Sequence, residues 1–416
     1  MLDAVVVGAG QAGLGISYCL ARDGREHVVL ERGRIGETWR SQRWDSFAVN
    51  TPNAMNALPG TTYEGDQPDG FFLRDELVES FEQYARRFDL PIRTGVTVTS
   101  IDPSDDGTFV VTTDDEDQRT VETKNVVIAS GIMCAPKVPA VSAKIDEEVL
   151  QLHAADYRNP AALPPGAVVI IGSGQSGCQI AEDLVGSGRH VYLCTSRVGR
   201  IPRRYRGRDI LEWWDEMGFL DAQVADLDDP SLRFAAQPQV SGVGRYGHTV
   251  SLQQMAAAGV ILFGRLADAD GHRLELADDL AANVRFADEA AARFEQAIDA
   301  HLEQAGRDLP PRDDDPADDP HPDPDALDAP RSLDLAEAGV GAIIWCTGFT
   351  ADFGWINCPV LDERGAPQIE RGVSSTPGLY FLGFPWLHTR KSGIIYGIDE
   401  DARHIAEHLG RRRSTQ

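Results

Sequence analysis

The sequence contains little cysteine, and none of its cysteines forms the close pair that thiol redox chemistry uses. The six cysteines are Cys19, Cys134, Cys178, Cys194, Cys346 and Cys358. Because no C-x-x-C or C-x4-C pair occurs among them, the redox-active disulfide of flavin disulfide reductases is excluded. Several cysteines lie in apolar runs, where they act as small hydrophobic residues. The pattern indicates a reducing compartment, and we expect a cytoplasmic protein.

Long apolar runs and an excess of basic charge are also missing. No apolar run reaches the ~20 residues of a membrane-spanning helix, and the first strand should begin almost at Met1, so we expect no signal peptide. The net charge is −26, whereas nucleic acids and anionic membranes bind proteins with a dominant basic surface. No Ser-His-Asp set or group of metal ligands stands out. We therefore expect a small-molecule partner, with no nucleic acid, no membrane and no metal.

A glycine-rich turn near the start of the chain is the first motif that points to a ligand. Val5–Val7 should form a buried strand, residues 8–13 a Gly-x-Gly-x-x-Gly turn, and residues from about 12 to 22 a helix. Such a turn lets the backbone and the helix N-terminus approach a pyrophosphate. The next strand ends in Glu31, near the spacing at which an acid receives ribose hydroxyls. A dinucleotide site is predicted, and a structural turn is the alternative. The candidate cofactor-binding residues are Gly8, Gly10, Gln11, Ala12, Gly13, Glu31 and Arg32.

A second unit of the same kind follows in the middle of the chain. Val168–Ile171 should form a buried strand, and the turn at 172–177 leads into a helix that ends near Val185. The position that corresponds to Glu31 is Thr195, and Ser196 and Arg197 follow it. A carboxylate would repel a 2′-phosphate, whereas serine and arginine bind one. The first unit therefore suits FAD and the second suits NADP(H). The candidate residues of the second unit are Gly172, Gly174, Gln175, Ser176, Gly177, Ser196 and Arg197.

The two units predict an α/β protein with two Rossmann-like dinucleotide-binding domains, as in glutathione-reductase-like folds, the second inserted in the first. At 416 residues the chain is long enough for this. The predicted FAD-binding domain comprises 1–155 plus 336–416, and includes an antiparallel meander of three short strands between 96 and 122. The predicted NADP(H)-binding domain spans 160–335. Its insertion, 205–335, contains an Asp/Pro-rich tract at 308–330 that should be extended or mobile.

Taken together, these motifs resemble the flavin-containing monooxygenases, class B flavoproteins that include the plant indole-3-pyruvate monooxygenases and many bacterial relatives. The resemblance rests on the paired turns, on Gly36-Glu37-Thr38-Trp39 and on Cys346-Thr347-Gly348-Phe349. The family signature Phe-x-Gly-x-x-x-His-x-x-x-(Tyr/Phe) is matched at His153 and Tyr157, while its leading Phe and Gly are absent. Baeyer–Villiger relatives, which form esters, carry Trp at the last position of this signature. Tyr157 therefore disfavours ester formation.

The resemblance implies one catalytic residue and further cofactor contacts. Asn50 falls where the family has an asparagine at the flavin face that helps to hold the oxygenated flavin, and a buried structural amide is the alternative. Further cofactor contacts are expected at Thr38, Trp39, Arg40, Val98, Ser130, Gly131, Thr347, Gly348 and Gly383.

The implied activity is that of an FAD-dependent, NADPH-consuming monooxygenase. NADPH would reduce the flavin, and O2 would then form a flavin C4a-hydroperoxide that oxygenates a small molecule at nitrogen, sulfur or a carbonyl. Two alternatives stay open. One is an NAD(P)H-dependent flavin reductase or dehydrogenase without productive oxygen transfer, and the other is a non-catalytic redox-sensing flavoprotein. A homodimer also stays open.

Overall fold

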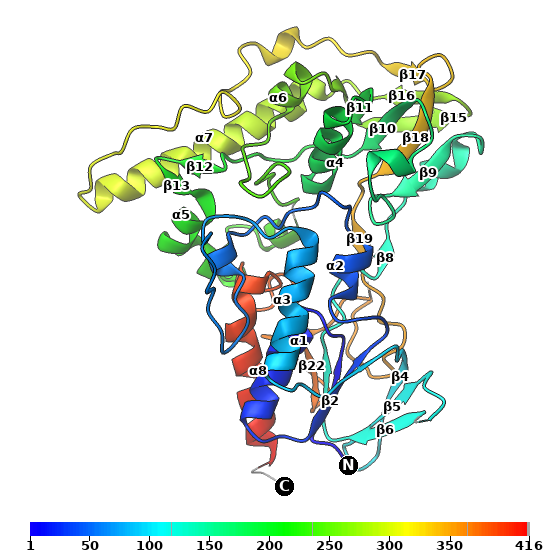
Figure 1. Cartoon of the computed structure of the whole chain (residues 1–416), viewed down its shortest axis with the longest axis vertical. Coiled ribbons are helices and arrows are strands. Elements are labelled where there is room, and N and C mark those ends of the chain that lie inside the picture. The colour runs from blue at the N-terminus through cyan, green and yellow to red at the C-terminus, as the bar shows by residue number, and fades with distance from the viewer. Residues whose placement is uncertain (118, 235, 364, 414–416) are drawn as a thin grey trace.

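The computed structural model, which describes residues 1–117, 119–234, 236–363 and 365–413, contains two parallel sheets that follow one another along the long axis of the molecule (Figure 1). The strands of the first sheet are β1 (Ala4–Val7), β2 (His27–Glu31), β3 (Ile92–Thr94), β7 (Val126–Ile128), β20 (Ile369–Glu370), β21 (Val373–Ser374) and β22 (Leu379–Phe381). Their order is β20-β21-β22-β7-β1-β2-β3. The strands from β22 to β3 are parallel, which explains their nearly continuous apolar runs.

Three helices cover this sheet, and a small meander forms a separate sheet in the same domain. The helices are α1 (Gln11–Arg22), α3 (Arg74–Arg87) and α8 (Ile398–Arg413), and α1 packs against both of the others. The short α2 (Glu37–Ser41) follows β2. The predicted meander is confirmed, because β4 (Val98–Pro103), β5 (Phe109–Thr113) and β6 (Thr120–Thr123) pair antiparallel.

The second sheet has five parallel strands in the order β14-β11-β10-β18-β9. Their bounds are β9 (Leu150–His153), β10 (Ala167–Ile171), β11 (Val191–Cys194), β14 (Ile261–Phe263) and β18 (Val340–Trp345). Helices α4 (Gln175–Gly186) and α6 (Leu252–Ala257) belong to this unit. The placement of 150–155 and 336–345 in the first domain is corrected by the pairing, since β18 lies between β10 and β9. The chain leaves the first sheet before β9 and returns to it after β18.

Two chain crossings join the sheets, and they lie side by side. Strands β8 (Ala135–Pro136) and β19 (Phe349–Thr350) pair antiparallel between the two units. The ring Nε2 of His153, at the end of β9, hydrogen bonds to the Gly348 carbonyl at 2.9 Å. The two crossing segments, which contain β8 and β19, are therefore hydrogen bonded to each other and form one two-stranded connection between the domains.

The insertion is folded and has its own hydrophobic cluster. Its elements are β12 (Arg204–Tyr205), β13 (Arg208–Asp209), α5 (Ile210–Glu216), β15 (Leu266–Asp270), β16 (Arg273–Leu276), α7 (Leu280–Gln304) and β17 (Ser332–Asp334). Trp213 and Trp214 of α5 pack with Ile298 and Leu302 of α7. Helix α7 begins after Asp279, which is its N-cap residue.

The Asp/Pro tract at 308–330 is extended and runs along α7 (Figure 1). Charged contacts hold it there. The buried Arg200 pairs with Asp318 of the tract and with Asp288 of α7, both at 2.8 Å, and Arg312 pairs with Glu295. Ion pairs of Arg312 and Asp318 hold the tract against α7, and Leu327 and Ala329 near its end pack against the hydrophobic core.

We expect the Glu295→Gln variant to lose less stability than the parent between pH 6 and pH 8. Burial, together with the charge of Asp318, raises the pKa of Glu295 from 4.5 to about 7. The folded chain thus binds a proton that the unfolded chain releases, so this contribution to stability is lost as the pH rises through about 7. Glutamine stays neutral throughout. Melting temperatures at both pH values test this, with Glu289→Gln, an exposed carboxylate on the same helix, as control. An unchanged pH dependence in Glu295→Gln would contradict the assignment.

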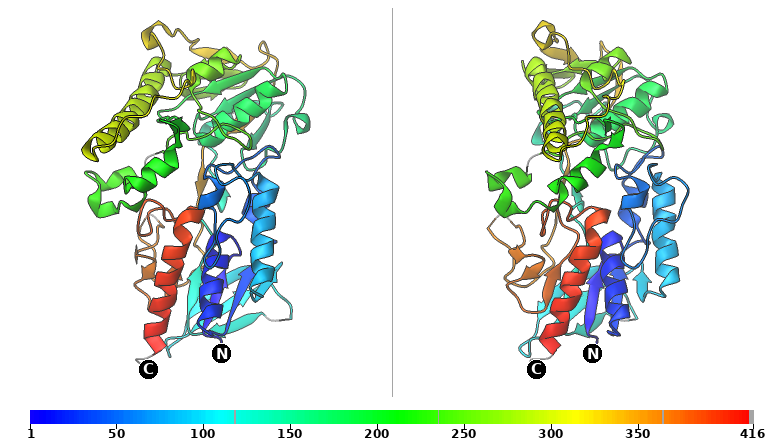
Figure 2. Two further views of the ribbon diagram at one scale, coloured as in Figure 1. Left: turned by 60° about the vertical axis from the view of Figure 1, so that its left-hand side comes forward. Right: turned by 90° about the vertical axis from the view of Figure 1, so that its left-hand side faces the viewer.

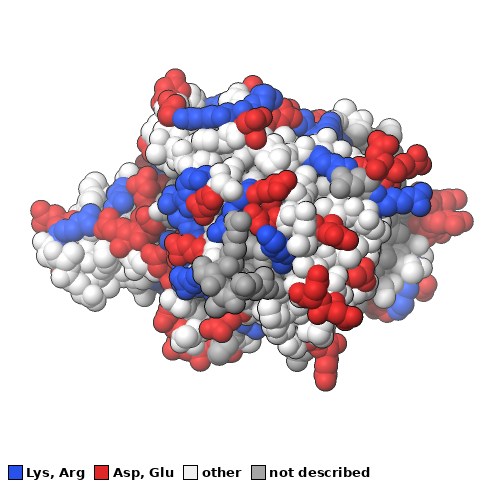
Figure 3. Space-filling view, turned by 90° about the horizontal axis from the view of Figure 1, so that it is seen from below, with Lys and Arg blue, Asp and Glu red and all other residues white. Residues whose placement is uncertain are grey.

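At the end of the first domain that carries the termini, the described residues form no continuous basic surface (Figure 3). Figure 3 shows acidic and basic side chains interspersed over this face. Within the described ranges, no helix is both long enough and apolar enough to cross a bilayer.

Candidate functional site

A cavity of about 470 Å³ opens at the carboxyl ends of the first sheet's parallel strands. The ends of β1, β2 and β7, the N-terminus of α1 and the loop after β22 all contribute to its wall. This edge of an open α/β sheet is where ligands bind, because the strand order reverses there and leaves a crevice. The predicted cofactor residues that line the cavity are Gly8, Gly10, Gln11, Ala12, Glu31, Arg32, Thr38, Trp39, Val98, Ser130, Gly131 and Gly383.

The two glycine-rich turns have the same construction. Gly8 has a φ of +105°, and a Cβ there would lie 2.6 Å from the Ala129 carbonyl oxygen at the end of β7. Gly172 has a φ of +106°, and its Cβ would lie 2.7 Å from the Cys346 carbonyl oxygen at the end of β18. The first glycine of each turn is thus required both by its left-handed backbone and by the neighbouring strand.

The middle glycine of each turn faces open space. A Cβ added to Gly10 or to Gly174 would meet no heavy atom within 4 Å. Each is the N-cap residue of the following helix, α1 or α4, and no side chain caps either helix. The N–H groups at these helix ends are therefore available to an anion.

Glu31 holds the first turn in position. Its buried carboxylate accepts hydrogen bonds from the Ala9 N–H at 2.7 Å and from the Gly33 N–H at 2.8 Å. A carboxylate has about four lone-pair sites, so two such bonds leave acceptor capacity toward the cavity that Glu31 lines. The predicted contact with ribose stays a prediction.

Other predicted contacts lie outside the cavity wall. Arg40 forms an ion pair with Glu82 of α3 at 2.6 Å. Gly13 packs against the turn itself, since a Cβ there would lie 1.8 Å from the Gly8 carbonyl oxygen. Thr347 hydrogen bonds to the Lys137 carbonyl across the chain crossing, and Gly348 accepts from His153. These residues shape the scaffold around the cavity.

Arg43 lines the cavity and was not predicted from the sequence. Its guanidinium carbon lies 5.2 Å from the Trp39 ring centroid and 5.3 Å from that of Phe47, and Nη2 lies 3.2 Å from Met133 Sδ. Burial lowers the pKa of Arg43 to about 10. It has no ion pair with any described residue. Gly36 and Glu37 of the motif quoted above also line the wall. The other wall residues that sequence reasoning missed are Val7, Leu30, Val96, Thr97, Ala129, Ile132, Met133, Cys134, Ala135, Asp352, Trp355, Pro385 and Gly393.

Asn50 lies where the two domains meet, outside the cavity wall. Its side-chain oxygen accepts a hydrogen bond from Gln179 Nε2 of α4 at 3.3 Å. Its backbone carbonyl accepts one from Arg203 Nη1 at 2.9 Å. The residue predicted at the flavin face is therefore held by two side chains of the second domain.

The second turn is bordered by the segment 239–242. The side chain of Gln175 donates to the Ser241 carbonyl and accepts from the Val240 N–H at 2.7 Å. Ser196 lies beside the turn, and its N–H donates to Ser173 Oγ at 2.9 Å. Arg197 is exposed, with its guanidinium carbon 4.5 Å from the Phe286 ring centroid.

Tyr157 of the partly matched signature connects the domains. Its buried hydroxyl donates to Asp183 Oδ2 of α4 at 2.5 Å, and Ser46 Oγ donates to Asp183 Oδ1 at 2.7 Å. Asp183 thus joins the linker before β10 to the segment that leads to Asn50.

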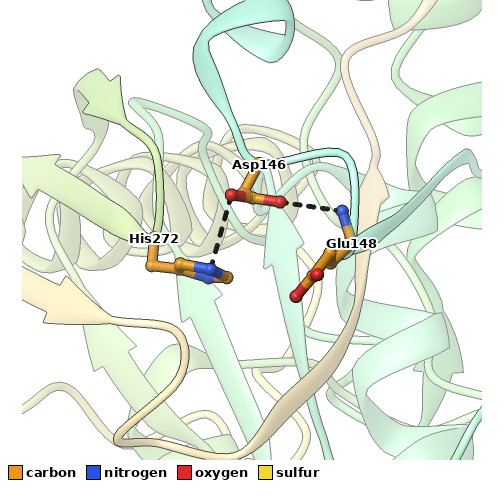
Figure 4. Close-up of side chains that lie close together, drawn as sticks. All are labelled: Asp146, Glu148 and His272. Carbon is orange, nitrogen blue, oxygen red and sulfur yellow. Dashed lines mark hydrogen bonds and ion pairs between the residues drawn. The ribbon is translucent and has the colours of Figure 1, made fainter.

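Asp146, Glu148 and His272 lie close together in the second domain (Figure 4). Asp146 accepts a hydrogen bond from the Glu148 N–H at 2.9 Å, and its other oxygen lies 3.5 Å from His272 Nε2. These contacts join the turn before β9 to the hairpin of β15 and β16. They give the cluster a structural role.

Known proteins are similar to this chain in sequence and in fold. A family model described as pyridine nucleotide-disulphide oxidoreductase matches residues 5–215. An uncharacterized CzcO-like oxidoreductase from Geobacillus kaustophilus is 31% identical over 97% of each chain. The probable indole-3-pyruvate monooxygenase YUCCA9 from Arabidopsis thaliana is 27% identical over 49% of each chain. The structure of a flavin-containing monooxygenase from Stenotrophomonas maltophilia matches with a TM-score of 0.64 at 19% identity, over 99% of each chain. The predicted two-domain α/β fold and the resemblance are confirmed.

Proposed function

Because the chain belongs to the pyridine nucleotide-disulphide oxidoreductase family, and is an oxidoreductase, we propose that it is an FAD-dependent, NADPH-consuming monooxygenase of the flavin-containing monooxygenase type. The observation that carries the proposal is the pair of open turns, one at the carboxyl end of each parallel sheet, with Asn50 bound between the domains. The substrate is a small molecule, and O2 is the second substrate. We place the enzyme in the cytoplasm.

The residues around the first turn fit FAD. The N–H groups of α1 beside Gly10 suit a pyrophosphate, and Glu31 suits a ribose. Ser130 Oγ is a buried polar atom without a partner, and it belongs to a residue that lines the cavity. Since buried polar groups are nearly always hydrogen bonded, this hydroxyl supports a bound ligand.

The residues around the second turn fit NADPH. Gly174 leaves the α4 N-terminus open. The side-chain oxygens of Gln179 and Gln239 are buried without a partner. Gln179 lies on α4, and Gln239 Nε2 bonds to the Ser173 carbonyl within the turn. As with Ser130, an unpartnered buried oxygen beside the turn supports a bound ligand.

The raised pKa values of the cysteine thiols disfavour a disulfide reductase activity. Burial raises the pKa of Cys19 to about 11 and the pKa of Cys194 and Cys346 to about 12. The thiolate is the reactive form, so these buried cysteines are poor nucleophiles. No C-x-x-C or C-x4-C pair supplies a redox-active disulfide.

Bound FAD would supply hydride acceptance and oxygen activation, which no side chain of the protein provides. The chain's own residues bind and orient the cofactors and exclude water. Gln179 holds the side-chain oxygen of Asn50 and Arg203 holds its backbone carbonyl, at the junction that both nucleotides would approach. The substrate classes that remain are amines or amino acids, sulfides, ketones and 2-oxo acids.

Stopped-flow spectroscopy of the purified holoenzyme tests the proposed function. Anaerobic NADPH should bleach the flavin absorbance, and NADPH consumption in air should be coupled to oxygen incorporation into a small-molecule substrate. Immediate reoxidation with stoichiometric H2O2, even with good substrates present, would indicate a reductase. Failure of NADPH to reduce the flavin would indicate a non-catalytic flavoprotein.

The Arg197→Ala variant should raise the KM for NADPH about 10- to 100-fold, because a charge-assisted contact with a phosphate contributes about 1.5–3 kcal/mol. The KM for NADH should change less than about threefold, since NADH lacks the 2′-phosphate. Steady-state kinetics with both nucleotides measures the ratio. Equal effects on the two would refute the role of Arg197.

A further inference from the structure

The loop between β22 and α8 contains a partly buried cation that lacks a counter-ion. The guanidinium carbon of Arg390 lies 4.2 Å from the ring centroid of Phe219, 5.3 Å from that of Trp386 and 6.0 Å from that of Trp214. Its one hydrogen bond to a described side chain runs from Nη2 to Gln237 Oε1 at 3.5 Å. Among the described residues, Arg390 has no carboxylate within ion-pair distance. Burial lowers its pKa.

The missing partner does not reflect a shortage of acids. The chain has 65 acidic residues against 39 basic ones. Two of the acids lie on the segment that Arg390 packs against, and neighbours on the arginine's own loop bind both. Asp221 pairs with Lys391 at 2.5 Å, and Asp215 accepts the Tyr396 hydroxyl at 2.9 Å. Of these three loop side chains, Arg390 alone has no carboxylate partner among the described residues.

Removing a guanidinium from water without a carboxylate is unfavourable. The three aromatic rings offset part of that cost through cation–π contacts. Five N–H donors in a rigid planar fork suit the two oxygens of a carboxylate. A cationic fork within an aromatic wall matches a ligand that has an anionic group next to an apolar body.

The loop of Arg390 also forms part of the candidate flavin cavity. Pro385 and Gly393 line the cavity, and three residues of extended chain span at most about 11 Å. The loop is bound to the insertion, since the Arg390 N–H donates to the Ala222 carbonyl at 2.9 Å. Figure 2 shows the insertion helix α5 next to the segment that leads into α8. The backbone of Arg390 therefore lies within about 11 Å of Gly393 at the cavity wall.

We propose that Arg390 binds the carboxylate of the substrate, with Trp214, Phe219 and Trp386 against its apolar part. This inference rests on the proposed function and refines it. It selects carboxylic acids, such as 2-oxo acids or amino acids, over neutral ketones, simple amines and neutral sulfides.

Binding to the oxidised holoenzyme tests the proposal without turnover. Tryptophan fluorescence is titrated with acetate, phenylacetate and phenylpyruvate, and with the amide of each acid. At least one acid should bind wild type 10- to 100-fold more tightly than its amide. Arg390→Gln should remove this preference, and Arg390→Lys should keep part of it. Arg233→Gln is the matched control, because Arg233 stacks on the exposed Phe234 and should leave the preference unchanged.

Two results would overturn the proposal. One is that no acid binds wild type better than its amide, and the other is a preference that persists in Arg390→Gln. NADPH-dependent flavin reduction is measured on every variant, which detects loss of folding. If the acids bind through Arg390 but no oxygenated product forms, the carboxylate site stands and the monooxygenase proposal fails.

Discussion

A Gly174→Asp variant should fold and retain FAD, yet lose at least about 100-fold in the rate of flavin reduction at fixed low NADPH. The position tolerates a side chain in the free protein, because its φ is −71° and a Cβ there meets no heavy atom within 4 Å. The new carboxylate would stand at the N-terminus of α4, where we place the NADPH pyrophosphate. Placing like charges together costs several kcal/mol, and every 1.4 kcal/mol is a factor of ten in affinity.

The Gly10→Asp variant gives the reciprocal control. Gly10 has the same open surroundings, at the N-terminus of α1. We expect this variant to lose bound FAD while it keeps its affinity for NADPH, measured by calorimetry. Absorbance at the flavin band gives the FAD content of both variants, and circular dichroism confirms folding. If Gly174→Asp lost FAD, or Gly10→Asp kept it, the assignment of the two turns would be reversed.

The sequence predicted the parts of the site that depend on local backbone geometry. A Gly-x-Gly-x-x-Gly turn between a buried strand and a helix has few structural solutions, so the turns at 8–13 and 172–177 could be located. The short apolar runs separated by polar turns predicted the meander for the same reason. Glu31 could be found because its distance from the first glycine is set by one strand, one helix and the next strand.

The parts that depend on tertiary pairing could not be read in this way. The apolar pattern of β18 shows that the strand is buried but not which sheet it joins, so 336–345 was placed in the wrong domain. Arg40 and Arg43 stand close together in one short segment, yet Arg40 pairs with Glu82 while Arg43 reaches the cavity. Their roles differ because Glu82 of α3 lies beside Arg40, whereas Met133 of the cavity wall lies beside Arg43. The unpaired state of Arg390 likewise depends on partners that its neighbours occupy.

The Arg203→Met variant should lower the free energy of unfolding by about 3–5 kcal/mol, the cost of leaving one member of a buried ion pair alone. The Arg203 side chain is 1% exposed and that of its partner Asp209 is 4% exposed. Arg203 also binds the Asn50 carbonyl and lies 4.7 Å from the Phe71 ring centroid. We therefore expect a second effect, an increase in H2O2 released per NADPH, because Asn50 loses one of its two supports. Urea unfolding followed by circular dichroism and a peroxide assay measure the two effects.

Two comparison variants separate the ion pair from the contact with Asn50. The Arg203→Met/Asp209→Asn double variant removes both charges and keeps the side-chain oxygen that caps α5 through the Leu211 N–H at 2.9 Å. It should recover at least about half of the lost stability. Its release of H2O2 per NADPH should stay as high as in Arg203→Met, since the bond to Asn50 stays absent. Arg208→Met, whose ion pairs are a third exposed, should cost less than about 1 kcal/mol and leave the peroxide yield unchanged. If the double variant restored both properties together, Asn50 would not depend on Arg203, and the domain junction would owe its geometry to Gln179 and Tyr157 instead.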